Sequence, residues 1–148
     1  MKAALASGVA MLLMVAAAPV SAASTFHLIG GGTATISQVA FNVTVEGGGA
    51  ASGSFNCLMA GRSAFVLPAF GLAHLMKVQA QPTTATMNEN GSVVKFSGPG
   101  FLIMDGKNKQ SVLVNVWADV ANQQFQLTVV GVGTMPIENM LTGRFRLR

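Results

Sequence analysis

The sequence predicts an all-β protein, a single antiparallel β-sandwich or closed β-barrel of about eight to ten short strands after an N-terminal signal helix. Three observations support this prediction. Apolar and polar residues alternate with a period of two through most of the chain, as in strands with one buried face. Glycine-containing turn sequences separate the alternating segments at short intervals. At the start of the chain, a single lysine is followed by a short apolar run, which is typical of an export signal.

Residues 1–22 are expected to be a cleavable signal peptide. Lys2 supplies the charged end, and the apolar segment Ala3–Ala18 is shorter than the roughly 20 residues that a membrane-spanning helix needs. Small residues follow, so cleavage is expected after Ala22 or Ala23. Because no cysteine lies near this junction for lipid attachment, we expect a released protein, either secreted or periplasmic.

The remaining segment, residues 23–148, has the length of one domain with a sizeable core. Its fold cannot depend on an internal disulfide, because Cys57 is the one cysteine of the chain. Cys57 shares its strand face with Phe55 and Met59, which predicts a buried and unreactive thiol. Charged residues make up 9% of the chain and the formal net charge is +4, so nucleic acid is not an expected partner.

The first half of this domain is expected to contain short antiparallel strands. Phe26–Ile29 and Thr33–Ile36 are predicted strands, and we interpret Gly30–Gly32 between them as a turn. Val39–Glu46 shows the clearest alternation, with its valines and phenylalanine on one face. A second triple glycine then turns the chain into Ala51–Met59, which predicts an antiparallel hairpin.

The second half continues the pattern with further hairpins. Asn90-Gly91 is the strongest hairpin signal, since both residues tolerate the positive φ of a type I′ turn, and Asp105-Gly106 repeats it. Both faces of the segment 111–120 carry apolar residues, which predicts an interior strand of the sheet. The region 63–81 is irregular, and one strand is expected in it. The strands expected in this half are His74–Gln79, Thr83–Met87, Val93–Ser97, Phe101–Met104, Ser111–Val120, Gln124–Val130 and Arg144–Arg148.

Groups that carry catalysis are few and scattered, so we expect no enzymatic activity, no metal site and no cofactor. His27 and His74 lie in separate segments, and neither has a histidine or carboxylate at a spacing that suggests zinc. Asp119 shares a strand face with Trp117, which we interpret as a solvated face. The acids in or beside predicted loops are expected to have no function: Glu89, Asp105 and Glu138.

The last predicted strand carries a cluster of positive charge. Alternation places Arg144, Arg146 and Arg148 on the same face. A guanidinium group pairs well with carboxylate and phosphate, so these residues are a candidate anion-binding site for acidic polysaccharide or lipid head groups. The simpler interpretation, which we favour here, is that the charges protect an edge strand from aggregation.

Several segments also suggest a family resemblance. The sequence contains, in order, GGGTATIS, VAFNVTV, ASGSFNC, VVKFSGPGFL and a closing FRLR. In this order of motifs it resembles small secreted bacterial β domains of uncharacterised function, over roughly residues 30 to 148. The resemblance implies a β fold and export, and it carries no catalytic residues.

We therefore expect a non-enzymatic binding or structural module at or beyond the cell surface. Its outward faces are rich in Ser, Thr, Asn and Gln, which suit a polysaccharide ligand. One alternative is a carrier of a small apolar ligand, which needs an interior cavity of roughly 300 Å³ or more. A second is a hydrolase, which requires a histidine within hydrogen-bond reach of an acid, a serine or Cys57. With no Tyr and one Trp, the mature domain lacks the aromatic girdles of an outer-membrane barrel, and no stable membrane insertion is expected.

Overall fold

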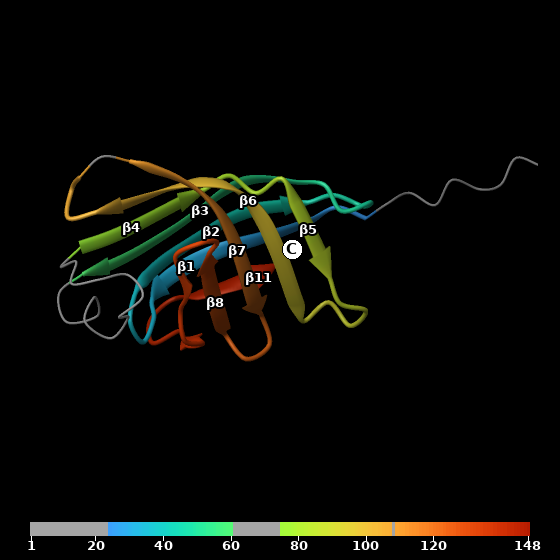
Figure 1. The fold of residues 1–148 in the computed structure, drawn as a ribbon. Helices are drawn as coiled ribbons and strands as arrows, with labels where there is room; N and C mark the ends of the chain where they lie inside the picture. The colour runs from blue at the N-terminus through green and yellow to red at the C-terminus, as the bar shows by residue number, and fades with distance from the viewer. Residues whose placement is uncertain (1–23, 61–74, 108) are drawn as a thin grey trace, which may run out of the picture.

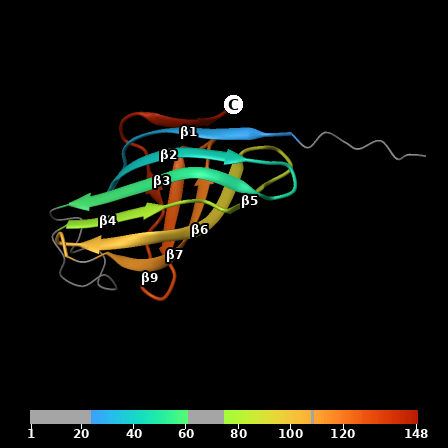
Figure 2. The same cartoon turned by 90° about the horizontal axis from the view of Figure 1, so that it is seen from above.

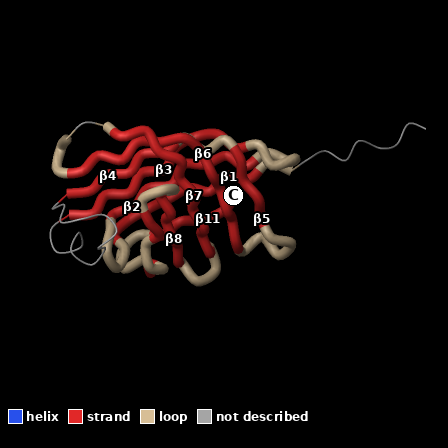
Figure 3. Tube along the Cα trace, in the orientation of Figure 1, coloured by secondary structure: helices blue, strands red, loops and turns tan. Residues whose placement is uncertain are grey.

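The computed structural model describes residues 24–60, 75–107 and 109–148. These residues form strands, turns and loops without any helix (Figure 3), which confirms the all-β prediction for this part of the chain. They accordingly contain no helix with the length and hydropathy to cross a membrane. The predicted signal segment and His74 lie outside the described residues.

The described residues form eleven strands, all paired antiparallel, in a single sheet. They are β1 (Phe26–Thr33), β2 (Gln38–Val45), β3 (Ala51–Ala60), β4 (Leu75–Ala80), β5 (Thr84–Met87), β6 (Val93–Met104), β7 (Gln110–Asp119), β8 (Gln124–Val129), β9 (Gly133–Thr134), β10 (Glu138–Asn139) and β11 (Arg144–Leu147). The strand order is β10-β8-β7-β6-β4-β3-β2-β1-β11, with β5 beside β6 and β9 beside β8. The interior position predicted for 111–120 is confirmed, because β7 lies between β6 and β8.

The sheet is curled into a half-barrel. In Figure 1, β2, β3 and β4 form the upper part of the molecule, and β7 bends down from it toward β8. Side-chain hydrogen bonds connect the two ends of the curl: Gln123, in the turn before β8, donates from Nε2 to the Phe145 carbonyl at 2.9 Å, and its Oε1 accepts from the Phe145 amide at 3.0 Å. Gln123 thereby occupies the amide and carbonyl of Phe145, which a further strand beside β11 would use.

The inner face of the curl is a core of apolar side chains. The faces predicted for β2 and β3 are confirmed, since their alternate apolar residues are buried. Alternate residues of β7 and β8 are buried in the same core. Phe41 lies at the centre of an aromatic cluster. Its ring centroid is 4.7 Å from that of Phe145, 5.3 Å from Phe55, 5.8 Å from Phe125 and 6.3 Å from Phe96. Such tilted and edge-to-face pairs add to the stability that burial alone provides.

The first triple glycine is not a turn, so that prediction is wrong. It lies inside β1, paired with β2 on one side and β11 on the other. A Cβ atom at Gly30 would lie 2.1 Å from the Arg144 carbonyl oxygen, and one at Gly31 would lie 2.2 Å from that of Val39. Glycine is needed here because both neighbouring strands approach the backbone closely. The two strands predicted at Val93–Ser97 and Phe101–Met104 are also one strand, β6, without a break between them.

The two predicted type I′ turns have different outcomes. Asp105 and Gly106 have φ values of 49° and 68°, and this prediction is confirmed because a type I′ turn requires both to be positive. At the other turn Gly91 has a positive φ of 68° but Asn90 does not, so it is not type I′. Its loop is longer than two residues, because β5 ends at Met87 and β6 begins at Val93. Within it the Asn88 carbonyl accepts a hydrogen bond from the Gly91 amide at 3.0 Å.

Candidate functional site

Polar and aromatic side chains form a row across the outer face of the sheet. In register, the row contains Asn56 of β3, Gln79 of β4, Phe101 of β6 and Ser111 of β7. These strands lie side by side in Figure 2. Neighbouring strands are about 4.8 Å apart, so the row from Asn56 to Ser111 spans roughly 14 Å. Two amides, an aromatic ring and a hydroxyl therefore face solvent within the length of a small ligand.

Two shallow hollows follow this row. The first has a volume of about 430 Å³, and its lining includes Ser54, Asn56, Gln79, Gln81, Phe101, Lys109 and Ser111. The second has a volume of about 550 Å³ and lies over β1 to β4, with a lining that includes Thr33, Gln38, Ala40, Asn56, Leu58 and Lys77. Asn56 belongs to both, so the hollows adjoin each other and follow one direction across the strands.

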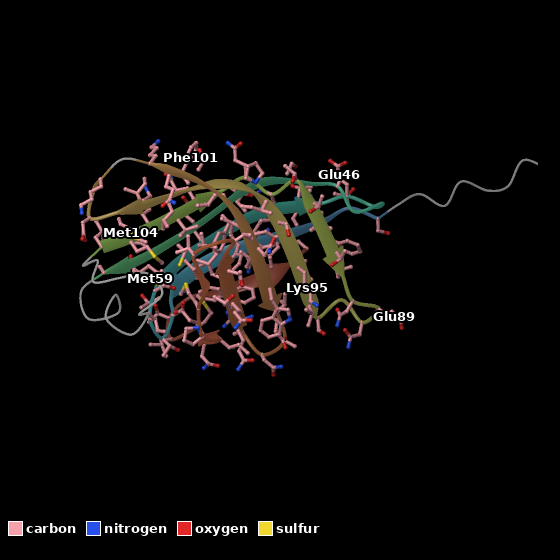
Figure 4. The ribbon with its side chains drawn as sticks, in the orientation of Figure 1. Glu46, Met59, Glu89, Lys95, Phe101 and Met104 are labelled. Carbon is pink, nitrogen blue, oxygen red and sulfur yellow. The ribbon has the colours of Figure 1, made fainter. Side chains whose placement is uncertain are left out.

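The first hollow combines oriented amides with an aromatic ring. Gln79 donates from Nε2 to Asn56 Oδ1 at 3.1 Å, which fixes both side chains. The Asn56 amide nitrogen and the Gln79 carbonyl oxygen are thereby left as a neighbouring donor and acceptor for a ligand. Phe101 is 43% exposed and points away from the sheet (Figure 4). The Lys109 ammonium lies 5.3 Å from the centroid of its ring, a cation–π distance.

The hollows lie outside the curl. A carrier of a small apolar ligand would instead need a cavity in its interior. The interior at the level of Phe41 is filled by the aromatic cluster. A third hollow, about 290 Å³, also lies on outward-facing side chains, among them Lys95, Asn115, Trp117 and Thr128. These three hollows therefore lie on the outer face of the part of the sheet that the structure describes.

The three C-terminal arginines lie on this same outer face. Arg144, Arg146 and Arg148 are exposed, while Phe145 between them is buried in the core. Arg144 is paired with Gly31 of β1, and this pairing continues the row of the two hollows across the sheet. The register thus aligns Arg144 of the predicted cluster with a second set of outward residues that the sequence pattern did not connect to it.

Of the residues considered for catalysis, His27 and Asp119 have separate hydrogen-bond partners, and His74 lies outside the described residues. His27 is exposed, and its Nδ1 lies 3.2 Å from Thr44 Oγ1. Asp119 supports a turn: hydrogen bonds from the backbone and side chain of Asn122, at 3.0 and 2.9 Å, hold the pKa of this carboxyl below its usual value. In the described ranges, no group of three or more His, Cys, Asp or Glu residues is placed to hold a metal ion.

The predicted burial of Cys57 is confirmed, and it leads to a prediction about alkaline pH. Burial raises the pKa of this thiol to about 12, above the value of about 8.5 expected in the unfolded chain. The folded state therefore holds its proton more tightly, and this contribution to stability is complete below about pH 8.5 and is lost as the pH rises toward 12.

We expect the free energy of unfolding of the wild type to fall by about 2 kcal/mol more than that of Cys57→Ala between pH 8.5 and 10.5. Urea unfolding at several pH values measures both curves, and other titrating groups affect the two proteins alike. Parallel curves would show that the thiol ionises as easily in the folded protein as in the unfolded chain.

Glu138 differs most from its sequence-based prediction. Expected to be a loop residue without function, it is completely buried. Its Oε2 accepts hydrogen bonds from the amides of Ile36 and Ser37 at 2.8 and 2.9 Å, and its Oε1 accepts from Ser37 Oγ at 2.9 Å. This carboxylate connects β10 to the turn between β1 and β2. Ser37 precedes it by 101 residues, and no local pattern predicts a contact at that separation.

The outward row is likewise not visible in the sequence pattern. The alternation identified outward polar residues, but only the register of β3, β4, β6 and β7 aligns Asn56, Gln79, Phe101 and Ser111. The candidate site rests on this geometry.

Comparison with protein-family models, curated proteins and solved structures finds no match to the chain.

Proposed function

We propose that the chain is an exported, non-enzymatic β protein that binds a polysaccharide on the outer face of its sheet. The observation that carries the proposal is the first hollow, where the Phe101 ring lies beside the paired amides of Asn56 and Gln79. A sugar ring has an apolar face of C–H groups and a rim of hydroxyls. An exposed aromatic ring with fixed hydrogen-bonding groups beside it suits both parts, as in other ligand sites.

The arrangement of the sheet supports a ligand on the outside. We interpret the curl as a barrel closed by side chains rather than as a sandwich, with Gln123 as the group that closes it against Phe145. A barrel of this kind protects its edge strands, and its phenylalanine cluster packs in the interior around Phe41. Export through the signal segment 1–22 and the resemblance to small secreted bacterial β domains belong to the same proposal, since extracellular polysaccharides are accessible to an exported protein.

Replacing Phe101 with alanine is expected to weaken polysaccharide binding about tenfold or more, because the platform under the sugar ring is removed. The purified protein is tested by isothermal titration calorimetry against a panel of neutral and acidic oligosaccharides. Leu141→Ala is the matched control, since Leu141 is an apolar side chain that is 65% exposed and does not line the hollow.

Two results would overturn the proposal. One is a panel in which no oligosaccharide binds. The other is a Phe101→Ala protein that binds with the affinity of the wild type, which would place the ligand elsewhere. The apolar-carrier alternative is included through a fatty acid in the same titrations, and it would be favoured if the fatty acid bound while every oligosaccharide failed.

A further inference from the structure

We infer that the polysaccharide is a polyanion, a chain of acidic sugars that crosses the strands from the Phe101 hollow to Arg144. This inference rests on the proposed function and specifies its ligand class. It depends on the signs of the charges around the two hollows and on the register that connects them. Each of these is independent of the aromatic platform that carries the proposed function.

The charged side chains that line the two hollows are both positive. Lys109 belongs to the lining of the first and Lys77 to that of the second, and no Asp or Glu of the described residues belongs to either. A neutral sugar chain needs no such bias. A chain with a carboxylate on each unit would gain charge-assisted hydrogen bonds from both ammonium groups.

The acidic residues of the described part lie away from this path or have other partners. Figure 4 shows Glu46 and Glu89 at the opposite end of the sheet from Phe101. Glu138 is completely buried, and Asp119 accepts hydrogen bonds from Asn122 in its turn. Asp105 accepts a hydrogen bond from the Leu75 amide. The field over the hollows is therefore dominated by the lysines and arginines, which attract anions.

The row between Asn56 and Arg144 carries only small residues. Between Asn56 and Arg144 the row contains Ala40 of β2 and Gly31 of β1. These residues project at most a methyl group from the sheet, so an extended chain can lie on the backbone there. From Ser111 to Arg144 the row crosses six strand spacings, or about 29 Å along the sheet. A chain of several sugars can therefore contact the protein at both ends of the row.

Arg144 is suited to the far end of such a chain. Its guanidinium group can bind a carboxylate through two parallel hydrogen bonds. Arg146 and Arg148 occupy the adjoining rows of the same exposed face and extend the positive surface beyond it. The arginine cluster and the Phe101 hollow then become the two ends of one binding path rather than separate features.

The test compares an oligogalacturonate with its fully methyl-esterified form of equal length, in which each carboxylate is replaced by an uncharged ester. We expect the acid to bind at least tenfold more tightly at low salt and to lose most of this advantage at high salt. Lys109→Gln and Arg144→Gln are each expected to weaken binding of the acid about three- to tenfold and to leave the ester unaffected. Lys95→Gln is the matched control, because Lys95 is a lysine on the outer face that lines neither hollow.

The possible results separate the inference from the proposed function. If acid and ester bind equally and Phe101→Ala weakens both, the inference is wrong and polysaccharide binding stands. If neither binds and no neutral oligosaccharide binds, both fail. Vesicles containing phosphatidylglycerol form a further arm, and binding to these vesicles without binding to the oligogalacturonate would assign the positive face to lipid head groups and overturn the inference.

Discussion

Replacing Glu138 with alanine is expected to lower the free energy of unfolding by about 3–5 kcal/mol. The substitution leaves the amides of Ile36 and Ser37 and the Ser37 hydroxyl without their acceptor, in a region where Ser37 is 3% exposed. A buried donor without a partner costs about 1–3 kcal/mol, and three donors are affected together. Urea unfolding followed by tryptophan fluorescence measures the loss.

Asp119→Ala is the control for this experiment. Asp119 is also a carboxylate that accepts two hydrogen bonds, but it lies in a solvated turn, and water can replace it as the acceptor. We expect its removal to cost less than about 1 kcal/mol. Equal losses for Glu138→Ala and Asp119→Ala would contradict the buried carboxylate as a link between β10 and the β1–β2 turn.

Replacing Phe41 with alanine is expected to cost about 3–5 kcal/mol, as for other large-to-small changes in tightly packed cores. Phe41 is 3% exposed, and its ring contacts four other phenylalanine rings. Because these rings lie on separate strands, they cannot easily move into the cavity that the substitution leaves. Equilibrium unfolding in urea gives the change in stability.

Phe101→Ala removes the same atoms from the outer face and serves as the comparison. Because Phe101 is 43% exposed, we expect a loss of less than about 1 kcal/mol. The comparison also establishes that the variant used to test polysaccharide binding is folded. A small loss for Phe41→Ala would mean that the cluster is loosely packed, with space for a ligand in the interior.

The fold class and the inward faces could be predicted from the sequence because both follow from local alternation. The residues Val39, Phe41, Val43 and Val45 show this directly, since each was expected inward and each is buried. Cys57 was predicted in the same way. Burial of alternate residues depends only on the period of the strand and on one side of the sheet facing a core.

Other features depend on contacts between distant segments. Gly30–Gly32 reads as a turn because glycine marks turns and close backbone approaches alike, and only the pairing of β1 with β2 and β11 distinguishes them. The burial of Glu138 follows from its contact with Ser37, 101 residues away. The row of the candidate site requires the register of several strand pairs, and a shift by one residue in any pair would place other side chains beside Phe101.

Titration of ¹⁵N-labelled protein with an acidic oligosaccharide, followed by NMR, tests the central claim most directly. We expect the largest chemical-shift changes at the side-chain amides of Asn56 and Gln79 and at the backbone amides of Phe101 and Ser111, with smaller changes extending toward Arg144. Changes centred on interior residues such as Phe41, or on the third hollow around Trp117, would contradict a polysaccharide site on this face.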